Sequence, residues 1–196
     1  MQIAEYRASL RRTFEEQYKR IESSFGELSD EQLSWTLDEK TWSVGHCLYH
    51  IWLTNDKYLV EVLNALKEAR YPAPDEQDYE SNGMGRRFIA KIGPDGGPNV
   101  PVPKSLKPEK KKVPLGIRQL VMEQLTAFDE FVQESHRVDM VKTKLRSPVM
   151  PLVRLQLGDV FKALAGHNER HLRQAERIMR TAGFPGGARA SAAPVS

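Results

Sequence analysis

The stretch LGDVFKALAGHNERHLRQAERIMRTAG, residues 157–183, decides the fold class of this 196-residue chain. On a helix that turns about 100° per residue, its apolar residues occupy one arc, and charged residues such as Glu169 and Arg170 occupy the opposite arc. Gly183 follows the last periodic residue, as is typical where a helix ends. The stretch therefore predicts an amphipathic helix whose apolar face packs against other elements.

Three further segments show helical spacing of their apolar residues, over 3–25, 44–69 and 115–136. Ser43 directly precedes the second of these segments and is a good N-cap. The sequence SDEQ at 29–32 resembles a capping box that opens one short turn. Four helices in one domain predict an all-α fold of the four-helix-bundle type.

The domain organisation follows from the segments between and after these helices. We predict a single domain over residues 1–184, a long loop over 71–114 and a disordered tail over 185–196. The loop holds most of the chain's twelve prolines, together with GPDGGP at 93–98, and this density is expected to deny it regular structure. A connection this long is a crossover, a lid or the sign of a wrong assignment. We favour a crossover that packs over one end of the bundle, with Phe88, Ile89 and Ile92 to bury.

Composition and charge argue against several classes of protein. Apolar residues make up 40% and charged residues 28% of the chain, with a net charge of only +3. The one dense basic run, Lys110–Lys112, has no interleaved aromatic residues, so nucleic-acid binding is not expected. The chain has no apolar run that could span a bilayer and no signal-peptide pattern, so we expect a cytoplasmic protein without a membrane partner. Cys47 is the only cysteine, which excludes an internal disulfide and a cysteine zinc cluster.

His167 and His171 stand four residues apart in the last predicted helix. His171 lies within the apolar arc, and His167 lies at its margin beside Gln174. Imidazoles at this spacing have Cβ atoms about 6 Å apart, close enough to chelate one divalent cation. Asn168 stands where a zincin metalloprotease has its general-base Glu, so that reading fails. The pair remains either two polar surface residues or part of a metal site that needs a third ligand.

Three other histidines are candidates for that third ligand. His136 ends the third helix, where a cation suits the helix dipole, and we interpret it as a surface residue. His46 occupies the third helical position after Ser43, which favours a capping or solvent-facing role. His50 lies on a shoulder of its helix rather than at the centre of the apolar face. A groove position of this kind is compatible with a metal ligand.

The ordered set of TWSVGHCLYHIW at 41–52 and HNERHLRQ at 167–174 resembles the DinB-like (DinB/YfiT) superfamily. The resemblance covers the chain from the first helix to about Ala182. It implies an up-down-down-up four-helix bundle and a bacterial origin. It also implies a divalent metal held by three histidines, which fall here on His50, His167 and His171. Asn168 and Gln174 become candidate supporting or substrate contacts. His46 departs from the family pattern, since relatives often carry an acidic or amide residue there, and it is a cap, a spare ligand or a substrate contact.

The resemblance also bears on function. Three neutral imidazoles leave an open coordination position, as in catalytic zinc sites. Zn or Ni is the expected ion, although imidazole suits Cu and Fe as well. Characterised relatives include transferases and isomerases that use low-molecular-weight thiols such as bacillithiol or mycothiol. We therefore expect a metal-dependent enzyme of the thiol-transferase or hydrolase type that acts on a small molecule. The alternative is a non-catalytic bundle, stabilised by metal or acting as a stress-related interaction protein, and a homodimer is compatible with both. No catalytic residue is assigned, since Asp56 is a poor candidate for a general base.

Overall fold

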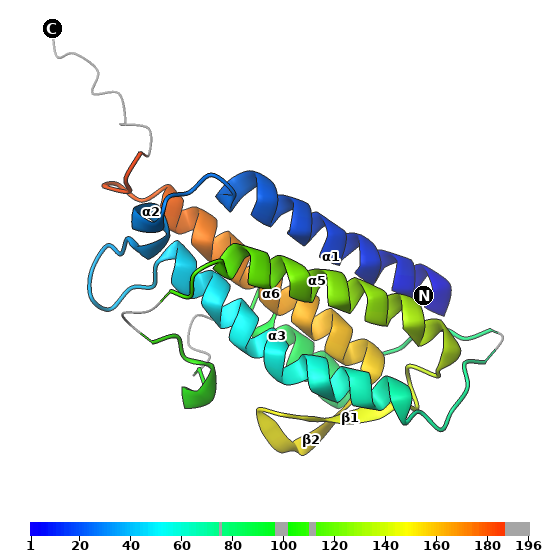
Figure 1. The fold of residues 1–196 in the computed structure, drawn as a ribbon. Helices are drawn as coiled ribbons and strands as arrows, with labels where there is room; N and C mark the ends of the chain where they lie inside the picture. Colours follow the sequence, from blue (N-terminus) through cyan, green and yellow to red (C-terminus); the bar gives the residue numbers. More distant parts are fainter. Residues whose placement is uncertain (75, 97–101, 110–112, 187–196) are drawn as a thin grey trace, which may run out of the picture.

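The computed structural model describes residues 1–74, 76–96, 102–109 and 113–186 and is mostly helical, with one small two-stranded sheet (Figure 1). The four long helices are α1 (Ile3–Phe25), α3 (Val44–Lys67), α5 (Ile117–Glu134) and α6 (Leu157–Met179). The shorter helical elements are α2 (Asp30–Ser34), α4 (Gly83–Ile92) and the 3-10 turns η1 (Lys104–Leu106) and η2 (Ser135–Arg137). The predicted all-α class and the four predicted helices are therefore confirmed, with ends that differ by a few residues.

The four long helices pack around one apolar core. Both α1 and α3 lie against α5 and α6. The rings of Phe14 on α1 and Phe128 on α5 stack with centroids 5.6 Å apart, and both side chains are fully buried. Ile51 of α3 and Leu164 of α6 are fully buried as well. Each buried side chain of this size contributes about 1.5–3 kcal/mol, so the apolar stripes predicted from the sequence hold the helices together.

Side-chain caps mark where α2 and α3 begin. Ser29 accepts a hydrogen bond from the backbone of Gln32, whose side chain accepts one from the backbone of Ser29, so the predicted capping box is present. Ser43 caps α3 in the same way, with His46 as its partner. These hydrogen bonds fix the first residue of α3, and therefore also the positions of the side chains that follow along the helix.

The helix α4 corrects the prediction for residues 71–114, which expected no regular structure there. Asn82 caps α4 by accepting a hydrogen bond from the backbone of Gly85 at 2.8 Å. Phe88 is buried, and Ile89 and Ile92 pack against the core, as the sequence led us to expect. The asparagine cap and the spacing of Phe88 and Ile92 are helix signals that the surrounding prolines and glycines obscured.

The hairpin of β1 (Lys144–Ser147) and β2 (Met150–Gln156) is a second unpredicted feature. Its strands are antiparallel, with Leu145 opposite Leu155, and both of these side chains are buried. The hairpin packs beside α3. The strand signal was weak because the segment is short and carries two prolines, which disfavour strands in a sequence-based assignment.

Besides residues 75 and 97–101 of the predicted loop, two further predicted features lie wholly or partly outside the described residues. These are the basic run at 110–112 and the part of the tail from residue 187 onward. Among the helices that the structure describes, none is both long and apolar enough to cross a bilayer.

The contact between α4 and α6 depends on a very close approach of Gly85 to Asp159. A Cβ on Gly85 would lie 1.8 Å from Oδ2 of Asp159, a fully buried carboxylate. The hydroxyl of Tyr79 donates a hydrogen bond to Oδ1 of Asp159 at 2.7 Å. The Tyr79 ring also stacks on that of Tyr6, with centroids 4.0 Å apart. These contacts fix the segment that leads into α4 between α1 and the start of α6.

We predict that Gly85→Ala lowers the free energy of unfolding by about 1–3 kcal/mol, because the added methyl group forces Asp159 or α4 to move. Gly83→Ala is the matched control on the same helix, since a Cβ there meets nothing within 4 Å. Alanine at that position should leave stability unchanged or raise it by up to about 1 kcal/mol. Urea unfolding measures the free energy of unfolding of both variants. Equal changes in the two variants would contradict the close approach of Gly85 to Asp159.

Candidate metal centre

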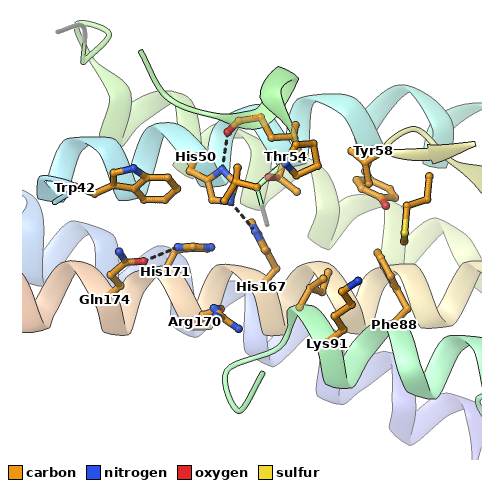
Figure 2. A pocket seen from close by; sticks show the side chains of 16 residues that line it. Trp42, His50, Thr54, Tyr58, Phe88, Lys91, His167, Arg170, His171 and Gln174 are labelled. Atoms are coloured by element: carbon orange, nitrogen blue, oxygen red, sulfur yellow. Dashed lines mark hydrogen bonds between the residues drawn. The ribbon is translucent and has the colours of Figure 1, made fainter. Parts of the chain in front are cut away.

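Three histidines from two helices converge on one point. His50 projects from α3, and His167 and His171 project from successive turns of α6 (Figure 2). Each offers one ring nitrogen, and these atoms all lie within 4.8 Å of one another. The Nε2 atoms of His50 and His167 are 3.2 Å apart. All three side chains are buried.

The donor set fits a divalent metal ion. Four ligands at roughly 2.0–2.1 Å in a tetrahedron place neighbouring donor atoms about 3.3 Å apart, close to the separation of the His50 and His167 nitrogens. Buried polar groups cost free energy unless they find partners. Among the described residues, Nδ1 of His167 is buried without a hydrogen-bond partner of acceptable geometry. Nε2 of His167 faces Nε2 of His50 instead, and a shared cation would give these two inward-facing nitrogens a common partner.

Hydrogen bonds fix the orientation of two of the rings. Nδ1–H of His50 donates to the backbone carbonyl of Leu106 at 2.7 Å. Nδ1–H of His171 donates to Oε1 of Gln174 at 2.9 Å. Since Nδ1 carries the proton in both rings, Nε2 presents its lone pair to the centre of the cluster. Such outer hydrogen bonds orient metal-binding histidines and raise their basicity.

Burial keeps the three imidazoles neutral. It lowers the pKa of His50 to about 4, with the nearby charge of Arg170 acting in the same direction. Burial and the neighbouring His50 lower the pKa of His171 to about 3. The pKa of His167 also falls well below its ordinary value because of burial and the two other rings. Neutral imidazole is the form that binds metal, so protons do not compete for the site near pH 7.

A pocket of about 320 Å³ opens over the cluster (Figure 2). Its walls come from α3, α4 and α6, from the segment around η1 and from the hairpin. None of the described residues that line it is Asp or Glu. The lining residues are Trp42, His50, Thr54, Tyr58, Phe88, Lys91, Ile92, Val102, Pro103, Leu106, Val149, Met150, His167, Arg170, His171 and Gln174. The crossover was predicted to pack over one end of the bundle, but its helix α4 packs along α6 and so supplies part of the wall.

The other residues singled out in the sequence fall in different places. Gln174 lines the pocket beside His171. Asn168 does not line it, because its amide donates to Gln17 of α1 at 3.4 Å on another side of α6. His46 is buried rather than solvent-facing, and its Nδ1 accepts from the backbone N–H of Ser43 at 3.1 Å. His46 therefore acts as a helix cap and lies outside the pocket lining.

Several lining residues were not identified from the sequence. Arg170 was assigned to the charged face of its helix, whereas its guanidinium donates to the carbonyls of Gly93 and Gly96 and lines the pocket. This error arose because α4 was not predicted from the sequence. The carbonyls of Gly93 and Gly96 lie at the end of α4 and just beyond it. Thr54 and Tyr58 stand four and eight residues after His50, so helical spacing carried a signal for both.

Comparison with known protein families assigns the chain to a family. The family model of the DinB superfamily matches residues 13–175, a span that includes all three histidines. The chain belongs to the DinB superfamily. Among curated proteins and among solved structures, no significant match was found.

We predict that the metal-free protein loses stability as the pH falls from 7 toward 4. Histidine has a pKa of about 6.5 in an unfolded chain, whereas burial lowers the pKa of His50 to about 4 and that of His171 to about 3. Below about pH 6.5 the unfolded chain therefore binds protons that the folded chain does not. Each such histidine lowers the unfolding free energy by up to about 1.4 kcal/mol per pH unit.

Urea unfolding of chelator-treated protein at several pH values measures this slope. His50→Gln removes one titrating group and should make the slope shallower. His136→Gln replaces an exposed histidine outside the cluster and is the matched control. An identical slope in the His50 variant and the native chain would contradict the assignment.

Proposed function

We propose that this protein binds one divalent metal ion through His50, His167 and His171 and uses it in a reaction on a small molecule. The observation that carries the proposal is the convergence of three neutral, buried imidazoles, two of them held by outer hydrogen bonds, at the wall of a pocket. Structural zinc sites are closed by four protein ligands, whereas catalytic sites keep one position for water or substrate. Three ligands beside a pocket support the catalytic type.

The reaction we propose is of the thiol-transferase or hydrolase type, with Zn or Ni as the ion. When bound, the metal would supply Lewis acidity and lower the pKa of a coordinated water or thiol. Cys47 is fully buried, and burial raises its pKa well above the ordinary value, so this side chain is unsuited to be the reacting thiol. A thiol reaction at this centre would therefore use a low-molecular-weight thiol from solution.

The chain's own residues would position the reactants rather than move protons as strong bases. Trp42 packs its ring against those of His50 and His171, with centroids 5.0 and 5.9 Å away, and so shields that side of the cluster from water. Tyr58 shares a hydrogen bond of 2.8 Å with Ser147, and burial raises its pKa to about 12. It would thus stay protonated and serve as a hydrogen-bonding group at the far end of the pocket.

A second candidate function is a non-catalytic bundle that binds metal for stability or acts as a stress-related interaction protein. The observation in its favour is that no carboxylate lines the described pocket, so a general base of that kind is missing there. The two functions differ in what metal loss does to the fold. A structural ion contributes folding free energy, whereas a catalytic ion in a prebuilt site contributes much less.

The proposal also covers the topology of the bundle, the cellular location of the protein and its partners. We infer an up-down-down-up bundle, which is supported by Figure 1, where α1 and α6 run in one direction and α3 and α5 run in the other. The long connection that contains α4 allows α3 and α5 to be parallel. We further propose a cytoplasmic protein with a small-molecule partner, with no role in binding nucleic acid or membranes, that could form a homodimer.

We predict one equivalent of Zn or Ni per chain in protein prepared without a polyhistidine tag and reloaded with either ion. His167→Ala should lower metal affinity by more than the roughly 10–100-fold typical of residues that only orient a ligand. His136→Ala, which removes an exposed histidine outside the cluster, should retain full metal content. Elemental analysis measures content, and absence of metal in the reloaded native chain would refute both the catalytic and the structural role of a metal ion.

Unfolding of the same proteins separates the two candidates. For a catalytic ion, metal-free protein and His167→Ala should stay folded with unfolding free energies within a few kcal/mol of the loaded native chain. For a structural ion, both should lose most of their stability.

We predict that Gln174→Ala weakens metal binding by about 10–100-fold, because Nδ1–H of His171 loses its acceptor. Gln174→Glu keeps an acceptor at this place and should retain most of the affinity. Gln119→Ala removes an exposed amide on α5 and serves as the control. Competition against a chelating dye measures the affinities, and native affinity in Gln174→Ala would show that the hydrogen bond does not orient His171.

A further inference from the structure

The pocket over the histidines is uneven in charge. Two of its lining residues are cations, Lys91 from α4 and Arg170 from α6, whereas none of the described lining residues is a carboxylate. Most of the remaining wall is apolar. Such a lining disfavours a cationic ligand and favours one that combines a negative charge with a hydrocarbon part.

Lys91 is the cation available to a ligand. Its side chain extends from α4 into the pocket beside Phe88 (Figure 2). Within the described parts of the chain, no salt bridge to Lys91 is present. Arg170 differs, because its guanidinium already donates to the carbonyls of Gly93 and Gly96. One available ammonium group suits a ligand with a single negative charge.

Thr54 provides an independent sign that a polar ligand group belongs here. It lines the pocket on α3, one turn after His50, and its side chain is only 4% exposed. Its hydroxyl oxygen is buried and makes no hydrogen bond to any described residue. Buried hydroxyl groups in native proteins almost always have a partner, so a ligand oxygen is a natural candidate.

The apolar wall and the volume limit the rest of the ligand. Phe88 and Ile92 of α4, Leu106 of η1 and Met150 of the hairpin present hydrocarbon to the pocket. The volume of about 320 Å³ equals that of roughly ten water molecules. A chain or ring of a few carbons with one acidic group would fill such a space.

We infer that the pocket takes a small monocarboxylate, with its carboxylate paired to Lys91 and its hydrocarbon part against Phe88, Ile92 and Leu106. This inference rests on the proposed function in that it names the substrate class of the same site. It assigns Lys91 a role in choosing the ligand, separate from the histidines that would hold the metal. Lys91 is thereby the specificity-determining residue of the pocket.

The test is calorimetric titration of metal-free and zinc-loaded protein with three probes of one length: hexanoate, hexan-1-ol and hexylammonium. Hexanoate should bind about five- to tenfold more tightly than hexan-1-ol in both forms of the protein, as expected for a charge-assisted contact at a partly exposed site. Hexylammonium should bind most weakly. Lys91→Met should abolish the preference for hexanoate, and Lys91→Arg should restore it.

Arg87→Met is the matched control, because it removes one positive charge from an exposed position on the same helix that does not line the pocket. This variant should keep the preference for hexanoate. Loss of preference in both the Lys91 and the Arg87 variants would show a general charge effect and overturn the inference. Equal affinity for hexanoate and hexan-1-ol, or failure of hexanoate to bind either form, would overturn it too.

The outcomes also separate this inference from the proposed function. Hexanoate that binds only zinc-loaded protein, and equally well after Lys91→Met, would be held by the metal alone. That result overturns the role of Lys91 and leaves the metal site intact. Conversely, a chain that takes up no zinc but binds hexanoate through Lys91 would refute the metal-dependent function and support the carboxylate pocket.

Discussion

The packing of α3 against α6 is the constraint on which the rest of the structure depends. His50 meets His167 and His171 only because the two helices lie at one particular register. Fully buried apolar side chains, such as Ile51 on α3 and Leu164 on α6, set that register. A slip of one helical turn would move an imidazole by about 5.4 Å, which exceeds the 4.8 Å that spans the cluster. The core of the bundle is therefore also what builds the candidate metal centre.

The segment between α3 and α5 completes the site that α3 and α6 form. It supplies the carbonyl of Leu106 that orients His50, and it supplies the Phe88 and Lys91 wall of the pocket. Its position depends in turn on α4, which lies against α6 through the close approach of Gly85 to Asp159. The histidine cluster and the pocket wall therefore both depend on the position of α6.

Helical periodicity was enough to predict the long helices, and the caps of α2 and α3 could be read from Ser29 and Ser43. The grouping of His50 with His167 and His171 required more, since spacing within one helix says nothing about which residue of another helix lies opposite. The ordered resemblance to a family supplied that link. The roles of Arg170 and Asn168 could not be predicted from a helical wheel. A wheel shows which way a side chain points, but it does not show that α4 covers Arg170 or that Gln17 of α1 reaches Asn168.

The partner of His50 is a main-chain oxygen, and this has a consequence for how the centre can be altered. Every amino acid at position 106 would present the same carbonyl, so no single replacement there deletes the acceptor. Evolution or an experimenter can change this contact only by rerouting the backbone, through an insertion, a deletion or a proline nearby. A scan of side chains across the pocket would pass over Leu106 as unimportant to the ring of His50, although its peptide group holds that ring in place.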